Sequence, residues 1–188
     1  MRATLEGASV RLEAIDRARA ERIHRWYEDP ELVAPYDRYE PEGFLEFQES
    51  LDAAEGDPRS LAPRFAVVRR ADGLLVGCVG FYLAHPVLEY VDVWYVMGEP
   101  KARGQGLGSE AVSLLVGHIF ASTSVARVGA TCDVENVPST RLLEKIGMRR
   151  EGTIRSALFH HARWHDVLLY GITREEWASG NRPRPDGT

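Results

Sequence analysis

Arg103-Gly104-Gln105-Gly106-Leu107-Gly108 is a glycine-rich stretch near the middle of this chain. It follows an apolar run over residues 91–97 and opens a helix-like segment from Ser109 to Phe120, so the local order is strand, glycine-rich turn, helix. Glycines let the backbone turn sharply and approach a ligand closely. The first N–H groups of a helix have no partner inside it and lie at its positive end. The stretch therefore predicts a site for a phosphate group.

The spacing of the glycines excludes two common phosphate loops. A dinucleotide fingerprint needs G-x-G-x-x-G and a P-loop ends in Gly-Lys-Ser/Thr, whereas the glycines here fall as G-x-G-x-G. The spacing that fits is Arg/Gln-x-x-Gly-x-Gly/Ala, which resembles the acetyl-CoA pyrophosphate loop of the GNAT superfamily of N-acetyltransferases. A loop that merely turns the chain is the alternative, and the rest of the chain has to decide between them.

Composition and length predict one globular domain. The chain has 188 residues, of which 44% are hydrophobic and 27% charged, as is ordinary for a soluble protein. It has neither an apolar run of about 20 residues nor the apolar core of a signal peptide, so we expect a cytoplasmic protein without a membrane partner.

The cysteines and histidines give no metal-binding spacing. Cys78 and Cys132 stand far apart in apolar, strand-like segments, which predicts two buried, reduced thiols. His160, His161 and His165 alternate with aromatic and basic residues. We interpret them as surface or hairpin residues rather than ligands and expect no metal.

The distribution of charge is uneven. The net charge of −5 argues against nucleic acid as a direct partner. Residues 28–57 hold eleven acids and one base. Such a block is usually a solvated helix face; the functional alternative is an acidic wall that attracts a cationic substrate.

Periodicity and chain breakers divide the chain into strands and helices. Strands are expected at residues 9–15, 65–68, 74–81, 89–97, 126–132, 148–158 and 164–172, with a hairpin turn at Asp72-Gly73. Helices are expected after the N-cap Asp16, after Pro41 with Phe44, Leu45, Phe47 and Leu51 as the apolar face, at 109–120, and at 136–146 before Gly147. Residues 179–188 are expected to form a disordered tail.

This order of elements resembles the whole GNAT domain. Residues 133–148 look like its second signature, N-x-x-S/A followed by L-x-x-x-G-F/M, and residues 166–177 look like the last strand of the ribosomal-protein-alanine N-acetyltransferase (Rim-type) branch. The resemblance implies a single α/β (α+β) domain over residues 1–178. Its mixed, mostly antiparallel, twisted sheet would have about seven strands, splayed between the fourth and fifth, with about four helices.

The resemblance also implies acetyl-CoA as the co-substrate. The backbone N–H groups from Gly104 to Ser109 would hold the pyrophosphate, the strand around Val96 and Met97 would pair with the pantetheine amides, and Asn136 would hydrogen-bond the pantetheine arm. A helix N-cap fits Asn136 equally well. The implied contact set is Val96, Met97, Arg103, Gly104, Gln105, Gly106, Leu107, Gly108, Ser109 and Asn136.

The implied chemistry is acyl transfer from a thioester to an amine. Many GNAT members protonate the leaving thiolate from a Tyr seven residues after the motif Asn, but Leu143 stands there. Rim-type members are thought to use a Ser three residues after the Asn, which predicts Ser139 as catalytic; a helix first-turn residue is the alternative.

An amine is largely protonated at pH 7, so a general base must act directly or through water. Asp92 and Glu89 lie on the strand before the glycine loop, on opposite faces. An acid inside an apolar strand is costly unless it is used or solvated, which favours Asp92, with an exposed strand acid as the alternative.

The resemblance thus implies an N-acetyltransferase that acetylates a protein N-terminus or a small cationic amine. A silent acyl-CoA-binding or sensing domain, and an enzyme that uses a longer acyl-CoA, are the alternatives. The acceptor and the oligomeric state stay open, and a homodimer is one option.

Overall fold

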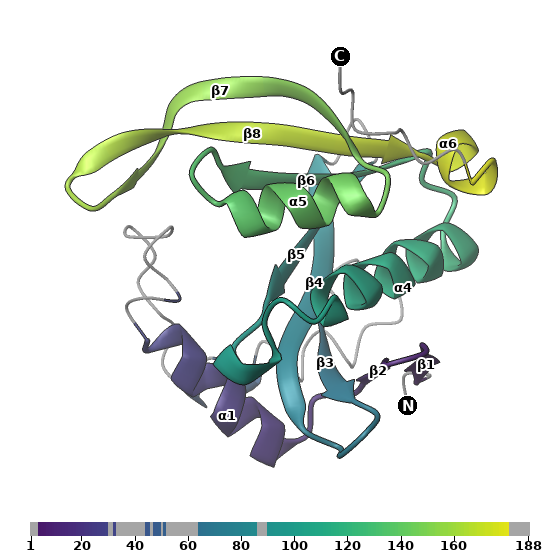
Figure 1. The fold of residues 1–188 in the computed structure, drawn as a ribbon, viewed down its shortest axis with the longest axis vertical. Helices are drawn as coiled ribbons and strands as arrows, with labels where there is room; N and C mark the ends of the chain where they lie inside the picture. Colours follow the sequence, from purple (N-terminus) through teal and green to yellow (C-terminus); the bar gives the residue numbers. More distant parts are fainter. Residues whose placement is uncertain are drawn as a thin grey trace.

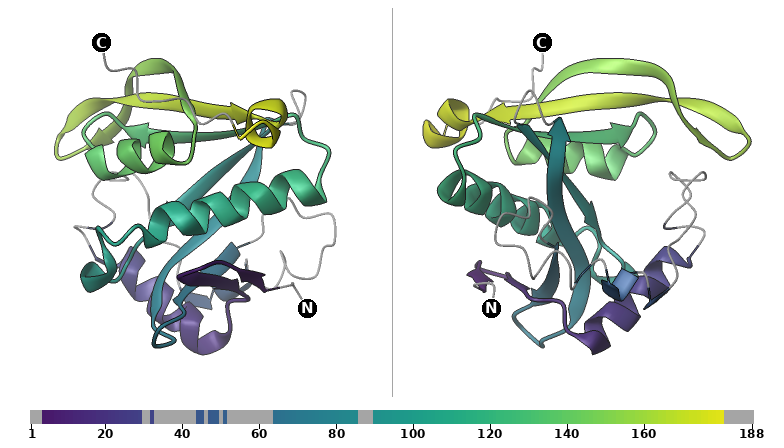
Figure 2. Two further views of the ribbon diagram at one scale, coloured as in Figure 1. Left: turned by 45° about the vertical axis from the view of Figure 1, so that its right-hand side comes forward. Right: turned by 180° about the vertical axis from the view of Figure 1, so that it is seen from behind.

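The structure is a computed structural model that describes residues 4–29, 32, 44–45, 47–49, 51, 64–85 and 90–180. In this part of the chain eight strands form one twisted sheet in the order β1-β2-β3-β4-β5-β6-β8-β7, with helices against it (Figures 1 and 2). The elements are β1 (Leu5–Glu6), β2 (Val10–Glu13), α1 (Arg17–Tyr27), β3 (Arg64–Arg69), β4 (Leu75–His85), β5 (Tyr90–Val96), the 3₁₀ helix η2 (Pro100–Ala102), α4 (Leu107–Ser122), β6 (Arg127–Asp133), α5 (Val137–Lys145), β7 (Arg149–His160), β8 (Arg163–Thr173) and α6 (Arg174–Ala178).

The sheet is mixed and mostly antiparallel, as the sequence predicts. All neighbouring strands pair antiparallel except β5 and β6, which are parallel. Parallel neighbours need a crossover connection, and here it contains η2, the glycine loop and α4. This crossover carries the glycine loop to one end of the β5–β6 pair.

The central strands are apolar on both faces because helices cover both. In β3, Phe65 and Val67 join the core cluster formed with α4 and α5, while Ala66 and Val68 join the cluster that contains Ala20 of α1. Successive strand residues point to opposite faces. The two clusters therefore lie on opposite faces of the sheet, which assigns α4 and α5 to one face and α1 to the other.

Several expected boundaries are confirmed. The Asp16 side chain caps α1 by accepting a hydrogen bond from Arg19 N (2.9 Å). Gly73, in the turn between β3 and β4, has a φ of 70°, a conformation that glycine adopts without strain. The expected number of strands was one too low because β1 has only two residues, and α6, with five, is also absent from the expected elements.

The expected helix after Pro41 is only partly described, since its start lies outside the described residues. Phe44, Phe47 and Leu51 are helical and contribute to the cluster with α1. The assignment of Leu45 to the apolar face is wrong, because its exposure is 68%. Phe44, Phe47 and Leu51 follow the i, i+3, i+7 spacing of one helix face, and Leu45 falls off that stripe.

Two further expectations fall mainly outside the described residues. Of the acidic block over residues 28–57, the structure describes the acids Glu28, Asp29 and Glu49, which are exposed. Of the expected tail, Ser179 and Gly180 close α6 through backbone hydrogen bonds to Glu175 and Trp177, and residues 181–188 lie outside the described part. None of the described helices combines the length and apolar character that crossing a bilayer requires.

Candidate active site

The sheet opens between β5 and β6. Their parallel pairing is restricted to Val91 with Val128 and Asp92 with Gly129, after which the strands diverge (Figure 1). On its other side β5 stays paired with β4 as far as Val96. Within these described strands, residues 93–96 of β5 therefore present an edge without a neighbouring strand, as the expected splay between the fourth and fifth strands requires. Such an edge can pair with an extended ligand.

The glycine loop lies at the end of that open edge. Gly104 and Gly106 have φ values of 74° and 79°, and Gly106 is the N-cap of α4. Both are left-handed conformations that a residue with a Cβ adopts only at a cost. The first intrahelical bond runs from Glu110 N to Gly106 O (3.1 Å). The N–H groups of Leu107 and Gly108 thus precede it at the helix N-terminus, the arrangement that binds phosphate.

Cations surround this loop. Arg103 Nε donates to Met97 O (3.2 Å), which ties the loop to the end of β5. Lys145 of α5 places its Nζ 3.5 Å from where a Cβ on Gly106 would lie. A groove of about 730 Å³, lined in part by Gly106, Lys145 and Trp177, runs from the loop along α4. The sequence pattern does not indicate Lys145 as a site residue, because only the packing of α5 against α4 brings it to the loop.

Asn136 and Ser139 lie at the start of α5, across the gap from β5. Asn136 Oδ1 accepts a hydrogen bond from Ser139 N (3.1 Å), so Asn136 is the helix N-cap. The hydroxyl of Ser139 has a different partner, the hydroxyl of Tyr95 on β5, at 2.5 Å. Leu143, where many relatives carry a Tyr, is fully buried in the core. Tyr95 was missed, although it shares the strand face of Val91 and Val93.

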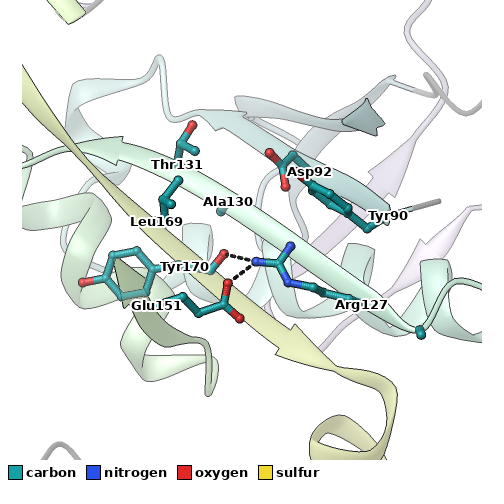
Figure 3. A pocket seen from close by; sticks show the side chains of 9 residues that line it. Tyr90, Asp92, Arg127, Ala130, Thr131, Glu151, Leu169 and Tyr170 are labelled. Atoms are coloured by element: carbon teal, nitrogen blue, oxygen red, sulfur yellow. Dashed lines mark hydrogen bonds and ion pairs between the residues drawn. The ribbon is translucent and has the colours of Figure 1, made fainter. Parts of the chain in front are cut away.

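Asp92 lies on the other face of β5, in a pocket of about 420 Å³ that Figure 3 shows. Arg127 and Glu151 line the same pocket and form an ion pair with each other. Burial raises the pKa of Asp92, while the charge of Arg127 opposes the rise. Gly129 makes room for the carboxylate, because a Cβ there would overlap Asp92 Oδ1. The structure therefore does not bring Asp92 together with Ser139, and Glu89 lies outside the described residues.

The prediction that both cysteines are buried is confirmed, whereas the prediction that the histidines lie at the surface is wrong for two of them. Cys78 and Cys132 are buried free thiols. His160 and His165 lie in the β7–β8 hairpin as expected, but they are not surface residues: their exposures are 5% and 3%. Both contact the buried carboxylate of Asp133. Sequence alone could not reveal this, because Asp133 comes from another strand and supplies the partner that lets the rings be buried.

Comparison with known proteins agrees with this geometry. A family model described as "Acetyltransferase (GNAT) domain" matches residues 9–149. "Uncharacterized N-acetyltransferase YnaD" of Bacillus subtilis (strain 168) is 31% identical over 140 residues, which cover 74% of this chain and 81% of that protein. "Ribosomal-protein-serine acetyltransferase" of Escherichia coli (strain K12) is 28% identical over 112 residues, which cover 60% of this chain and 61% of that protein.

A solved structure shares the fold. The spermidine N-acetyltransferase of Vibrio cholerae, in complex with CoA and spermine, superposes with a TM-score of 0.79 at 21% identity, covering 92% of this chain and 99% of the other. The open strand pair, the glycine loop at a helix N-terminus and the family match over most of the chain lead to one conclusion. The chain belongs to the GNAT acetyltransferase family and is an acyltransferase.

Proposed function

We propose that this enzyme transfers the acetyl group of acetyl-CoA to a primary amine by direct attack of the amine on the thioester. The observation that supports this most is that the open edge of β5 runs into the glycine loop at the start of α4. The amides of a pantetheine arm can pair with such an edge as an added strand does. The attached pyrophosphate then meets the helix N-terminus. One continuous surface thus suits the donor from its phosphates to its thioester.

The proposed donor site uses backbone groups for the phosphates and the strand edge for the arm. The Oδ1 atom of Asn136 accepts the hydrogen bond of the helix cap. Its NH₂ group can therefore donate to the pantetheine. Lys145 and Arg103 add positive charge near the pyrophosphate. The proposed contacts are Val96, Met97, Arg103, Gly104, Gln105, Gly106, Leu107, Gly108, Ser109 and Asn136, with Lys145 added.

Ser139 and Tyr95 are proposed to serve the leaving group. When the amine nitrogen attacks the carbonyl carbon, a C–N bond forms, the C–S bond breaks and negative charge develops on the sulfur. The hydroxyls of Ser139 and Tyr95 are 2.5 Å apart, so one donates to the other and orients it. Tyr95 donating to Ser139 leaves the Ser139 proton free for the sulfur, and a hydrogen bond to developing charge acts mainly in the transition state.

Asp92 is proposed to receive the proton that the amine loses. It faces the α1 side of the sheet, whereas Tyr95 faces the α4 side, so the acceptor and the leaving group approach the thioester from opposite faces. The two residues are three positions apart on β5, about 10 Å at the rise of a strand. A proton therefore reaches Asp92 through water rather than by direct contact.

The proposed acceptor is a cationic amine, either a protein N-terminus or a small polyamine. The pocket of Asp92 contains two carboxylates and one guanidinium, so its net charge favours a cation. The names of the relatives point to the same two kinds of acceptor: a ribosomal protein in one case, and spermidine in the other.

A panel of acceptors tests this proposal. The enzyme is incubated with acetyl-CoA and with polyamines, peptides bearing a free or a blocked N-terminus, or alcohols of matched size, while released thiol and acetylated product are measured together. We expect thiol release that requires an amine and equals the amount of N-acetyl product. Longer acyl-CoA thioesters, run in parallel, define the acyl group. Thiol release that is equal with and without amine would indicate hydrolysis and contradict the proposal.

A further inference from the structure

Three buried side chains that the proposed mechanism does not use meet beside the active-site turn. We call Asp133, His160 and His165 the histidine cluster; they come from the end of β6, the end of β7 and the start of β8. Their exposures are 5%, 5% and 3%. One nitrogen or oxygen from each lies within 4.8 Å of the others. Polar groups this deeply buried are costly unless they are paired or coordinate a metal.

The pairing within the cluster is incomplete. His160 Nε2 and Asp133 Oδ2 form a hydrogen bond of 2.6 Å. His165 Nδ1 lies 3.1 Å from the same oxygen, but neither of its ring nitrogens makes a hydrogen bond with the described residues. Buried polar atoms in folded proteins nearly always have a partner. The His165 ring is therefore a buried polar group that lies close to a carboxylate without forming a hydrogen bond with it.

We propose that the histidine cluster binds a divalent first-row transition metal, with Zn²⁺ as its simplest occupant. Two imidazoles and a carboxylate are a donor set that zinc accepts, with a fourth position left for water or another ligand. Glu135 can supply that fourth ligand, because its Oε2 lies 3.6 Å from His165 Nδ1 at the exposed rim of the cluster.

The surroundings of the cluster suit this role. His160 Nδ1 lies 2.7 Å from His161 Nδ1. A proton on His160 Nδ1, donated to His161, would leave the Nε2 lone pair for the metal, as the outer hydrogen bonds of metal-binding histidines do. Arg163 holds Glu135 through two contacts of 2.7 Å.

Metal binding also requires a small movement. The rings of His160 and His165 are stacked with centroids 3.5 Å apart and an angle of 24° between their planes. A nitrogen binds a metal along the lone pair in the plane of its ring, so two stacked rings cannot both point at one ion. At least one ring must therefore turn out of the stack when the metal binds. The stacking contact is then lost, and both imidazoles coordinate the ion.

The ion would connect the β7–β8 hairpin to the turn that begins α5. Asn136 N donates to Asp133 O (3.0 Å) and Glu135 N donates to Asp133 Oδ1 (2.5 Å), so Asp133 fixes the turn that carries Asn136. A ligand that binds only the folded state stabilises it. Zinc is thus expected to raise the melting temperature, whatever the acyl acceptor is.

Zinc competition with a chromophoric chelator tests the proposal on chain stripped of metal with EDTA. We expect one tightly bound Zn²⁺ per chain and a rise in Tm on its addition. His165→Gln should weaken binding by about 100-fold or more, because loss of an outer partner alone costs 10–100-fold. His118→Gln, which changes a histidine on α4 against Phe65, is the matched control and should bind as the wild type does.

Two further measurements keep the test independent of folding in the variant. Melting of the metal-free proteins shows whether His165→Gln is folded, and Co²⁺ substituted into the wild type reports the ligands through its visible spectrum. Absence of stoichiometric zinc in the wild type, or equal zinc affinity in folded His165→Gln, would overturn the proposal. A thiolate-to-cobalt charge-transfer band would also overturn it, since it would place Cys132 or Cys78 at the metal instead.

Discussion

Ser139 makes two separate hydrogen bonds, one through its backbone and one through its side chain. Its backbone N–H serves the Asn136 cap, while its hydroxyl serves Tyr95. Removing the hydroxyl therefore leaves the helix cap in place. A positioned acid–base group typically contributes about 10²–10⁴-fold, and a neutral hydroxyl should fall near or below the low end.

The first prediction follows from this separation. Ser139→Ala should lower kcat by about 10-fold or more, leave the acetyl-CoA Kd nearly unchanged and leave Tm close to that of the wild type. Steady-state kinetics, calorimetric titration and thermal melting measure these quantities. A wild-type kcat in the folded variant, under conditions where chemistry is rate-limiting, would make Ser139 purely structural.

Tyr95 gives the second prediction. Tyr95→Phe keeps the ring and removes the hydroxyl, so kcat should fall without a change in acetyl-CoA affinity. If the two hydroxyls act as a pair, the Ser139→Ala/Tyr95→Phe double variant should lose much less than the product of the two single effects, because residues in contact couple. Rate losses that multiply would show that the two hydroxyls act independently.

The role of a single residue can be predicted from sequence when its partners lie close to it in the chain. Ser139 and Asn136 are three residues apart, and one motif identifies both. Tyr95 is 44 residues from its partner Ser139, and Asp133 is 27 residues from His160. Such partners meet only because the sheet folds as it does, so spacing in the sequence cannot reveal them.

The loop before α4 is the element on which donor binding depends. Gly106→Ala puts a methyl group on a left-handed residue at a cost of about 1–2 kcal/mol and directs it toward Lys145 and the proposed pyrophosphate. We predict that acetyl-CoA affinity, measured by calorimetric titration, falls by about 10-fold or more, because the methyl group occupies space beside the proposed pyrophosphate. A tenfold loss corresponds to about 1.4 kcal/mol.

The turn between β3 and β4 supplies a matched control. Gly73 has a φ of 70°, and a Cβ there would meet nothing within 4 Å, so Gly73→Ala carries similar backbone strain at a distance from the proposed donor contacts. Its affinity for acetyl-CoA should equal that of the wild type. Equal affinities for Gly106→Ala and Gly73→Ala would move the donor away from the loop.

α6 gives a prediction that depends on pH. Glu176 accepts hydrogen bonds from Thr173 N and Thr173 Oγ1, at 2.9 and 3.1 Å, in a capping box. The bond from Thr173 N is the main cause that lowers the pKa of Glu176. A carboxyl group with a lowered folded-state pKa stabilises the fold above its unfolded pKa, about 4.3, and loses this effect as the pH falls through the folded value.

Glu176→Gln should therefore lower the free energy of unfolding by about 0.5–1 kcal/mol at pH 7. The difference from the wild type should shrink as the pH falls below about 4.3. Urea unfolding of both proteins from pH 7 to pH 3 measures it. A constant difference over that range would show that the ionised carboxylate is not what stabilises α6.

Regular elements could be predicted because their signals are local. The N-cap Asp16, the turn at Gly73 and the C-terminal Gly147 each mark a boundary through their own backbone preference. Gly147 has a φ of 97°, which only glycine adopts readily. The strand β1 has only two residues and is defined by its pairing with β2. It is therefore too short to show a periodic pattern in the sequence.

The proposed donor site depends on one interruption in an otherwise continuous sheet, between β5 and β6. The pairing of β5 with β6 stops after Asp92 and Gly129, while each strand keeps its outer partner. The crossover through α4 brings the glycine loop to the open end, and α5 brings Ser139 to the other side. The order of elements predicts this arrangement by family resemblance, but not the side chains that meet across it.

A crystal structure of the enzyme with CoA would show whether the donor binds along the open edge of β5 and at the glycine loop. We predict that the pantetheine lies between residues 93–96 of β5 and β6, that the pyrophosphate contacts the N–H groups of residues 104–109, and that the sulfur lies within hydrogen-bonding reach of Ser139 Oγ. CoA bound elsewhere, with the β5 edge empty and the sulfur away from Ser139, would contradict it.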